Sequence, residues 1–277
     1  MPTLSVGGYD VGYIDQGQGD LVILAHCSLG VASLWRPVMD RLSDRWRCIA
    51  FDLPGHGASQ RGDRSKWLQY QAIDYVIGLA DFAGAEKAHL VGLSLGGAVS
   101  ARAAHLHPER VRSLSLFEPI IFHFLDLWAP EEQAHDRKIM DPVFQACEEG
   151  RHHDGARMFM EGWGQPGQFD RMPGPAQDAI ARALKFIARD FPLSGQWPEG
   201  QLTEDDIRAV DTPTLIAHGE TTHNSAKVVN RGLHGLFPNS ELHEIADAGH
   251  LSPVDQPDAV ASQIARFLGS VEASELA

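Results

Sequence analysis

Cysteine is scarce in this sequence, and the number of cysteines is odd. The 277 residues include three, Cys27, Cys48 and Cys147, and their spacing follows no pattern. A disulfide framework needs an even set, and a zinc site of the usual kind needs closely spaced pairs of ligands. We therefore expect no disulfide framework, no metal site and a reducing, cytoplasmic location.

Long apolar runs and an excess of positive charge are also missing. No uninterrupted apolar segment is long enough to cross a bilayer, and residues 1–16 lack a basic stretch followed by an apolar one. Lys and Arg number 23 against 37 Asp and Glu, for a formal net charge of -14 at pH 7. Such a chain repels nucleic acid and anionic membranes. We expect a small neutral substrate, no nucleic-acid partner, no membrane insertion, and leave a homodimer open.

Repeats and low-complexity runs are absent too, and what remains is an alternation of strand-like and helix-like segments. The expected strands are residues 3–6, 11–15, 21–25, 48–51, 88–91, 111–117, 214–217 and 241–245. Helical spacing is found over residues 33–42, 67–84, 98–107 and 254–268. This alternation predicts an α/β fold whose sheet is mostly parallel and doubly wound, with an antiparallel hairpin at its start.

The alternation stops between residues 120 and 210. This stretch holds seven prolines, and we expect these prolines, Pro142 among them, to break its helices. The stretch is also rich in Phe, Trp and Met. We predict that residues 120–210 form a helical cap inserted after the sixth strand, and that residues 1–119 and 211–277 form the core domain. Phe122 and Trp128 stand early in the insertion and are candidates for a substrate pocket.

The most informative stretch is Gly92-Leu93-Ser94-Leu95-Gly96, which lies between an apolar strand and an Ala-rich helix. Glycines two before and two after a serine allow a sharp, strained turn that exposes its hydroxyl. The N–H of Leu95 and the positive end of the helix dipole then lie where charge would develop on an attacked carbonyl. A glycine-rich turn with an incidental serine is the alternative, but the flanking strand and helix favour a nucleophile.

Further motifs accompany this turn in a characteristic order. They are His26-Cys27-Ser28-Leu29-Gly30, the run from Asp52 to Ser59 (Asp-Leu-Pro-Gly-His-Gly-Ala-Ser) and Ala248-Gly249-His250. Together they make the chain resemble the α/β-hydrolase fold superfamily, in its capped, serine esterase-like branch, from about residue 11 to 268 apart from the insertion. The resemblance implies a serine, histidine and acid triad with an oxyanion hole, and no cofactor.

Carried over position by position, the resemblance assigns Ser94 as nucleophile and His250 as base. It implies an oxyanion hole built from the backbone N–H groups of Ser28 and Leu95. The oxyanion loop usually reads His-Gly, whereas this chain has Cys27 in the second position. We therefore expect the Cys27 side chain to reach the substrate pocket, together with those of Leu29 and Leu251.

The acid departs from the family pattern. An aspartate commonly stands three residues after the glycine that ends the penultimate strand, but here that position is Thr222. Three carboxylates remain as candidates. Glu118, at the end of the sixth strand, is the expected acid, and Glu220 is the alternative. Asp247 lies too close to His250 in the sequence to reach the far ring nitrogen easily.

The expected function is that of a serine hydrolase. It would cleave a carboxylic ester, or a related acyl bond, of a small, mainly apolar or aromatic substrate through an acyl-enzyme on Ser94. A serine at this position disfavours the dehalogenase and epoxide hydrolase branches, which attack through an aspartate. A lactonase, a carbon–carbon bond hydrolase, an acyltransferase and a weakly catalytic ligand-binding protein stay open as alternatives.

Overall fold

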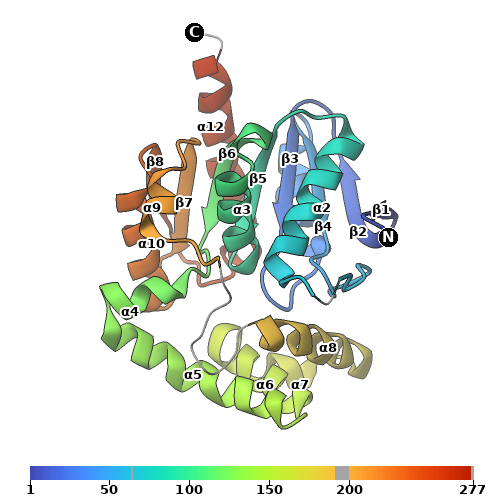
Figure 1. Cartoon of the computed structure of the whole chain (residues 1–277), viewed down its shortest axis with the longest axis vertical. Coiled ribbons are helices and arrows are strands. Elements are labelled where there is room, and N and C mark those ends of the chain that lie inside the picture. Colours follow the sequence, from blue (N-terminus) through green and yellow to red (C-terminus); the bar gives the residue numbers. More distant parts are fainter. Residues whose placement is uncertain (64, 191–199, 276–277) are drawn as a thin grey trace.

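The computed structural model of the protein describes residues 1–63, 65–190 and 200–275, and eight strands of these residues form one sheet (Figure 1). The strand order is β1-β2-β4-β3-β5-β6-β7-β8. The bounds are β1 Thr3–Val6, β2 Tyr9–Gln16, β3 Leu21–Ala25, β4 Arg47–Phe51, β5 Ala88–Leu93, β6 Val111–Phe117, β7 Thr214–Gly219 and β8 Ser240–Ile245. The pairs β1/β2 and β2/β4 are antiparallel and the others parallel. The predicted mostly parallel α/β sheet is confirmed.

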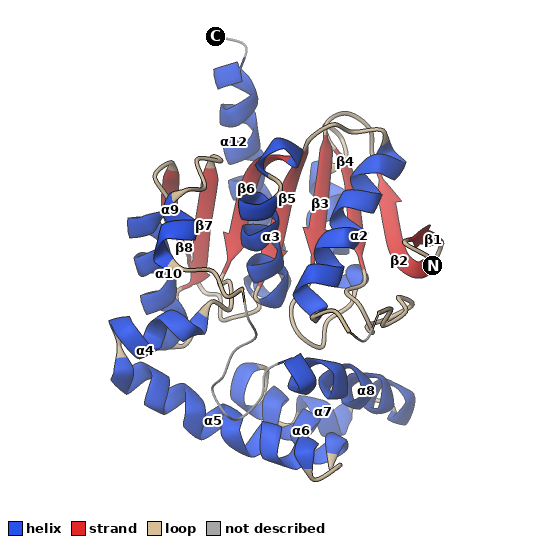
Figure 2. Cartoon of the chain, viewed as in Figure 1, coloured by secondary structure: helices blue, strands red, loops and turns tan. Residues whose placement is uncertain are grey.

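Helices cover both faces of the sheet (Figure 2). On one face lie α2 (Leu68–Ala83), α3 (Leu95–Leu106) and α10 (Asn224–Leu236), and on the other lie α1 (Arg36–Leu42) and α12 (Pro257–Glu275). Strands β3, β5 and β7 are buried at every residue. Such continuous burial is typical of parallel strands covered on both faces. No helix of the described chain is both long and apolar enough to cross a membrane.

Two predicted helices differ from those observed. Residues 33–42 divide into a 3-10 helix, η1 (Ala32–Trp35), followed by α1. The single helix expected over 254–268 is instead α11 (Ser252–Asp255) and α12, and α12 continues through Gly269. A glycine inside a helix costs about 1 kcal/mol relative to alanine, but Leu268 and Val271 on either side of it are buried. Tertiary packing therefore outweighs the local preference.

The described residues between β6 and β7 are mostly helical. Their elements are η3 (Phe122–Phe124), α4 (Leu125–Trp128), α5 (Pro130–Glu148), α6 (His152–Trp163), α7 (Gln168–Arg171), α8 (Gly174–Asp190) and α9 (Glu204–Arg208). The expected break at Pro142 is wrong, because α5 runs through it. The missing backbone hydrogen bond is offset by packing of the next turn, where Val143, Ala146 and Cys147 are buried.

The helices of this insertion, residues 120–210, fall into two groups. Helices α5 to α8 lie beyond the carboxyl ends of the strands (Figure 1), and α5, α6, α7 and α8 share a small apolar core of their own. Elements η3, α4 and α9 pack against α10, which α5 also contacts. The division of the chain into a core domain and a cap stays a prediction.

Candidate active site

The turn between β5 and α3 holds Ser94 in an uncommon backbone conformation. Its φ is 56° and its ψ is −113°, and positive φ is rare for residues other than glycine. A Cβ on Gly92 would collide with the backbone of Gly96, and one on Gly96 with the carbonyl of Ala25. The Ser94 N–H donates to the Phe117 carbonyl at 2.8 Å. The neighbouring strands thus hold the strained turn in place, with Ser94 at the N-terminus of α3.

The loop after β3 is organised by its histidine. Nε2 of the fully buried His26 accepts the Leu53 N–H at 2.9 Å. Nδ1 therefore carries the proton and donates to the Cys27 carbonyl at 2.7 Å. Burial lowers the pKa of His26 to about 4, so the ring is neutral at pH 7. The His26 carbonyl in turn accepts the Gly96 N–H at 3.1 Å, which ties this loop to the start of α3.

Cys27 lies in this loop beside the serine but in a state that suppresses its reactivity. Its side chain is 6% exposed, and burial raises the pKa of the thiol to about 12. A thiol attacks as the thiolate, so Cys27 is a poor nucleophile at neutral pH. The loop then turns sharply: Leu29 has a φ of 61°, and the Gly30 N–H donates to the Cys27 carbonyl at 3.0 Å.

Glu118 joins the end of β6 to His250. Its side chain is fully buried, and Oε2 lies 2.6 Å from Nδ1 of His250. The same oxygen accepts the Thr222 hydroxyl at 2.7 Å, and Oε1 accepts the Gly219 N–H at 2.8 Å. A buried carboxylate needs such donors, because losing water without replacement is strongly unfavourable. With Nδ1 engaged, Nε2 is the ring nitrogen of His250 that remains for another partner.

The other two carboxylates lie elsewhere. Glu220 is exposed, and its Oε2 accepts the Asp247 N–H at 3.0 Å. Asp247 is also exposed and has a φ of 54°. Their hydrogen bond stabilises the loop before His250 and does not involve its imidazole. Thr222, at the position where the family commonly has an aspartate, contacts the Glu118 carboxylate instead.

Ser94 and His250 line one cavity of about 160 Å³ between the sheet and the insertion. The predicted residues Cys27, Ser28, Leu29 and Leu251 line it too. Its other lining residues are Gly30, Leu34, Phe159, Met160, Trp163, Gly164, Gln168, Met172 and Ile180. The Trp163 ring meets the His250 ring edge to face, with centroids 4.9 Å apart. None of these lining residues is Lys, Arg, Asp or Glu, so the described wall is largely apolar.

Phe122 and Trp128, which we expected in the pocket, are not among the residues lining this cavity. Phe122 packs its ring against Trp163 at 5.5 Å between centroids. Trp128 stacks on Phe124, and its Nε1 donates to Glu204 at 2.8 Å. All these partners belong to the insertion, so both rings contribute to its own packing. The lining residues of α6 were missed because the sequence shows that α6 is apolar on one side without showing what that side meets.

Comparison with known proteins shows the family. Residues 20–257 match the family model described as alpha/beta hydrolase fold. The chain is 30% identical over 263 residues to the 2-hydroxy-6-oxo-2,4-heptadienoate hydrolase of Pseudomonas putida, covering 90% of this chain and 89% of that protein. It is 40% identical over 278 residues to the dihydrolipoyllysine-residue acetyltransferase component of the acetoin cleaving system of Pseudomonas putida, covering 95% of this chain and 68% of that protein.

Solved structures agree on the fold. The enol-lactonase from Burkholderia xenovorans LB400 superimposes with a TM-score of 0.76 at 19% identity, covering 97% of this chain and all of that one. Relatives matched along nearly their whole length include hydrolases. On the family match and the eight-stranded sheet, this chain belongs to the alpha/beta hydrolase fold family of enzymes.

Proposed function

We propose that the protein is a serine hydrolase that cleaves a carboxylic ester through an acyl-enzyme on Ser94. The observation that carries this proposal is the 2.6 Å contact between Glu118 Oε2 and His250 Nδ1, with His250 and Ser94 lining one cavity. A carboxylate on Nδ1 selects the tautomer whose Nε2 accepts a proton. It also stabilises the imidazolium that forms when the serine gives up its proton.

In this mechanism the Ser94 Oγ attacks the carbonyl carbon while its proton passes to His250 Nε2. The tetrahedral intermediate collapses, the bond to the leaving alkoxide breaks, and His250 returns the proton to that oxygen. Water then attacks the acyl-enzyme with His250 again as base, which releases the acid and restores Ser94. Glu118 orients His250 and takes no part in the proton transfers.

The backbone N–H groups of Ser28 and Leu95 are the proposed oxyanion donors. Leu95 is the first residue of α3, so its N–H points out of the helix where the dipole favours negative charge. Ser28 lines the cavity beside Ser94. Two such preorganised donors stabilise the developing charge by several kcal/mol, on the order of 3 for each donor removed in known cases.

The cavity supports a small, uncharged acyl group. Its described lining carries Phe159, Met160, Trp163, Met172 and Ile180 but no cation, and burying a carboxylate without a partner is strongly unfavourable. The substrate named for the relative at 30% identity is a carboxylate, whose recognition would need such a cation. The insertion supplies the aromatic and Met side chains, and we propose that it acts as a cap that excludes water.

Kinetic comparison of two esters tests the substrate class. The value of kcat/KM for p-nitrophenyl butyrate should exceed that for p-nitrophenyl hemisuccinate, whose acyl chain has the same four carbons but ends in a carboxylate, by at least tenfold. A preference for the hemisuccinate would contradict an uncharged acyl pocket and favour substrates like that of the relative.

A serine-directed fluorophosphonate tests the reaction itself. We expect one equivalent to add to the intact protein, with peptide mass analysis placing it on Ser94, and no addition to Ser94→Ala. A folded wild-type protein that stays unlabelled would contradict the hydrolase and support a ligand-binding role.

The acetyltransferase name of the 40% identical relative supports no acyltransferase here, because that protein extends well beyond the matched part.

A further inference from the structure

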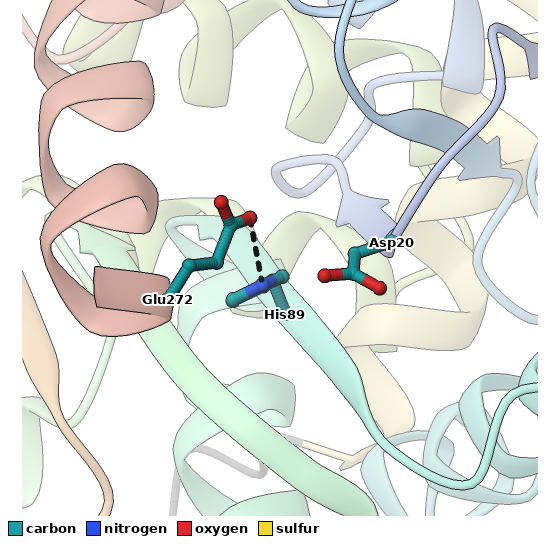
Figure 3. Close-up of side chains that lie close together, drawn as sticks. All are labelled: Asp20, His89 and Glu272. Carbon is teal, nitrogen blue, oxygen red and sulfur yellow. Dashed lines mark ion pairs between the residues drawn. The ribbon is translucent and has the colours of Figure 1, made fainter. Parts of the chain in front are cut away.

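A histidine and two carboxylates meet at the end of the sheet opposite Ser94 (Figure 3). His89 is the second residue of β5, Asp20 directly precedes β3, and Glu272 lies near the end of α12. One nitrogen or oxygen from each of the three lies within 4.8 Å of the others. Figure 3 shows the two carboxylates on either side of the His89 ring.

His89 brings an unused nitrogen to this cluster. The side chain is fully buried, and Nδ1 lies 2.7 Å from the Ser113 hydroxyl on the adjacent strand β6. Nε2 is buried and has no hydrogen-bond partner in the described residues; its 3.9 Å distance to Glu272 Oε1 is too long for one. Buried polar atoms in native proteins almost always have a partner, whether protein, water or ion. The environment of this nitrogen therefore suggests a partner from outside the protein chain, such as a water molecule or a metal ion.

The imidazole is in the form that binds metal ions. Burial first and the nearby Arg112 second lower the pKa of His89 to about 4, against the opposite effect of Glu272 and Asp20, so the ring is neutral at pH 7. Metal-bound histidines usually have their second nitrogen fixed by a hydrogen bond, which sets the tautomer. The contact of Nδ1 with Ser113 supplies that arrangement.

Both carboxylates are held by neighbours and keep free lone pairs. Glu272 Oε1 accepts the Trp46 indole N–H at 2.5 Å, and Oε2 pairs with Arg45 at 2.5 Å. Asp20 Oδ2 pairs with Arg112 at 2.5 Å. Each carboxylate oxygen has a second acceptor position, and metal-ligating carboxylates are commonly hydrogen-bonded in this way. Glu275 also pairs with Arg112, so the three carboxylates and two arginines of this region carry a formal net charge of −1, which favours a cation.

We propose that His89 Nε2, one oxygen of Asp20 and one oxygen of Glu272 bind a divalent transition-metal ion such as Zn²⁺. Zinc accepts such a mixed set at about 2.0 to 2.2 Å, with water as fourth ligand. Tetrahedral ligand atoms at those distances from zinc lie about 3.3 to 3.6 Å apart, so separations of up to 4.8 Å must close by about 1.2 to 1.5 Å. Asp20, whose side chain is 54% exposed, has the freedom to make most of this movement.

The proposed ion would link three segments that are far apart in the sequence. It would fasten the last turns of α12 to the start of β3 and β5, at the far end of the sheet from Ser94. Its role would be structural, so metal binding should raise the midpoint of thermal unfolding. Ester hydrolysis by the metal-free protein should proceed without it.

Calorimetric titration of the chelator-treated protein with Zn²⁺ tests this site. We expect one ion per chain, and a rise of several degrees in the unfolding midpoint at saturating zinc. His89→Asn keeps a polar group near the Ser113 hydroxyl but removes Nε2, and Glu272→Gln keeps an acceptor for Trp46. Each should weaken zinc binding at least 100-fold.

The matched control is Glu244→Gln. Glu244 on β8 pairs with His218 on β7 at 3.3 Å. This substitution therefore removes the carboxylate of a different His–carboxylate pair. Zinc affinity should be unchanged in this variant. The proposal would be overturned if the wild type bound no zinc when Zn²⁺ is present at 100 times the protein concentration. It would also be overturned if the wild type and Glu272→Gln bound zinc with equal affinity. Should His89→Asn fail to fold, Glu272→Gln and Asp20→Asn decide the matter.

Discussion

Glu118 Oε2 lies 2.6 Å from His250 Nδ1, and this contact joins two residues 132 positions apart. The carboxylate also accepts hydrogen bonds from Thr222 and Gly219. Three donors thus hold it in place, and in the proposed mechanism the ring that it orients needs no rearrangement before it accepts a proton. Preorganisation of this kind lowers the barrier, because no binding energy is spent on ordering the catalytic groups.

We expect Glu118→Gln to lower kcat for an aryl ester by about three to four orders of magnitude. An amide at this position can donate to Nδ1, which stabilises the wrong tautomer, and it no longer balances the imidazolium. Steady-state kinetics on p-nitrophenyl acetate, with circular dichroism to check the fold, measure the loss.

Glu220→Gln is the matched control for this variant, since Glu220 is the carboxylate in the neighbouring loop. It should lower kcat less than tenfold, because its hydrogen bond goes to the Asp247 N–H and not to the imidazole. If Glu220→Gln proved to be the inactive variant, the acid would have to come from the β7 end and the assignment of Glu118 would be wrong.

The sequence predicted the strands and the strained turn, because these follow from local patterns at strand ends. The ranking of Glu118 over Glu220 as the acid stays a prediction, and the contact of Glu118 with His250 supports it. The sequence did not predict that Thr222 would contact Glu118, since that contact depends on how the end of β7 faces the end of β6. The lining by Phe159 and Trp163 was equally hidden, because it depends on how α6 packs over the sheet. The continuation of α12 beyond Gly269 was also not predicted, because it depends on the burial of Val271.

Thr222→Val should lower kcat about tenfold or more. The Thr222 hydroxyl donates to the oxygen that holds His250, and a hydrogen bond to a buried charge contributes about 1.5 to 3 kcal/mol. Thr222→Ser keeps the hydroxyl and should keep most of the activity. Equal activity of the Val and Ser variants would contradict a role in positioning the acid.

Cys27 should react slowly despite lining the cavity. With a thiol pKa raised to about 12, roughly one molecule in ten thousand is thiolate at pH 8. Iodoacetamide at pH 8 should therefore leave ester hydrolysis unchanged over an hour, while unfolding in urea exposes all three buried cysteines. Rapid inactivation of the wild type, absent in Cys27→Gly, would contradict this expectation.

Buried neutral histidines should make the protein less stable in mild acid. Burial lowers the pKa of His56 to about 3, from 6.5 in the unfolded chain. Below pH 6.5 the unfolded chain binds a proton that the folded one does not, so stability falls with pH until about pH 3. His56 alone contributes a slope of about 1.4 kcal/mol per pH unit in this window.

Urea unfolding at pH 7, 6 and 5 measures that slope. His56→Asn keeps a donor for the Pro54 carbonyl, which Nδ1 contacts at 3.1 Å, and removes the titrating ring. The variant should lose stability less steeply than the wild type between pH 6 and 5. Identical slopes would show that His56 does not contribute.

Moving the acid to the position usual in the family is the strictest test of the site. Thr222 Oγ1 and His250 Nδ1 both contact Glu118 Oε2, at 2.7 and 2.6 Å, so the two atoms are at most 5.3 Å apart. We expect a carboxylate at 222 to reach the imidazole once the Glu118 side chain is gone. The kcat of the double variant Glu118→Ala/Thr222→Asp should therefore be at least ten times that of Glu118→Ala. Thr222→Asp alone should lower stability, because it places a second carboxylate against a buried one. A double variant no more active than Glu118→Ala would mean that only the β6 end can present the acid to His250.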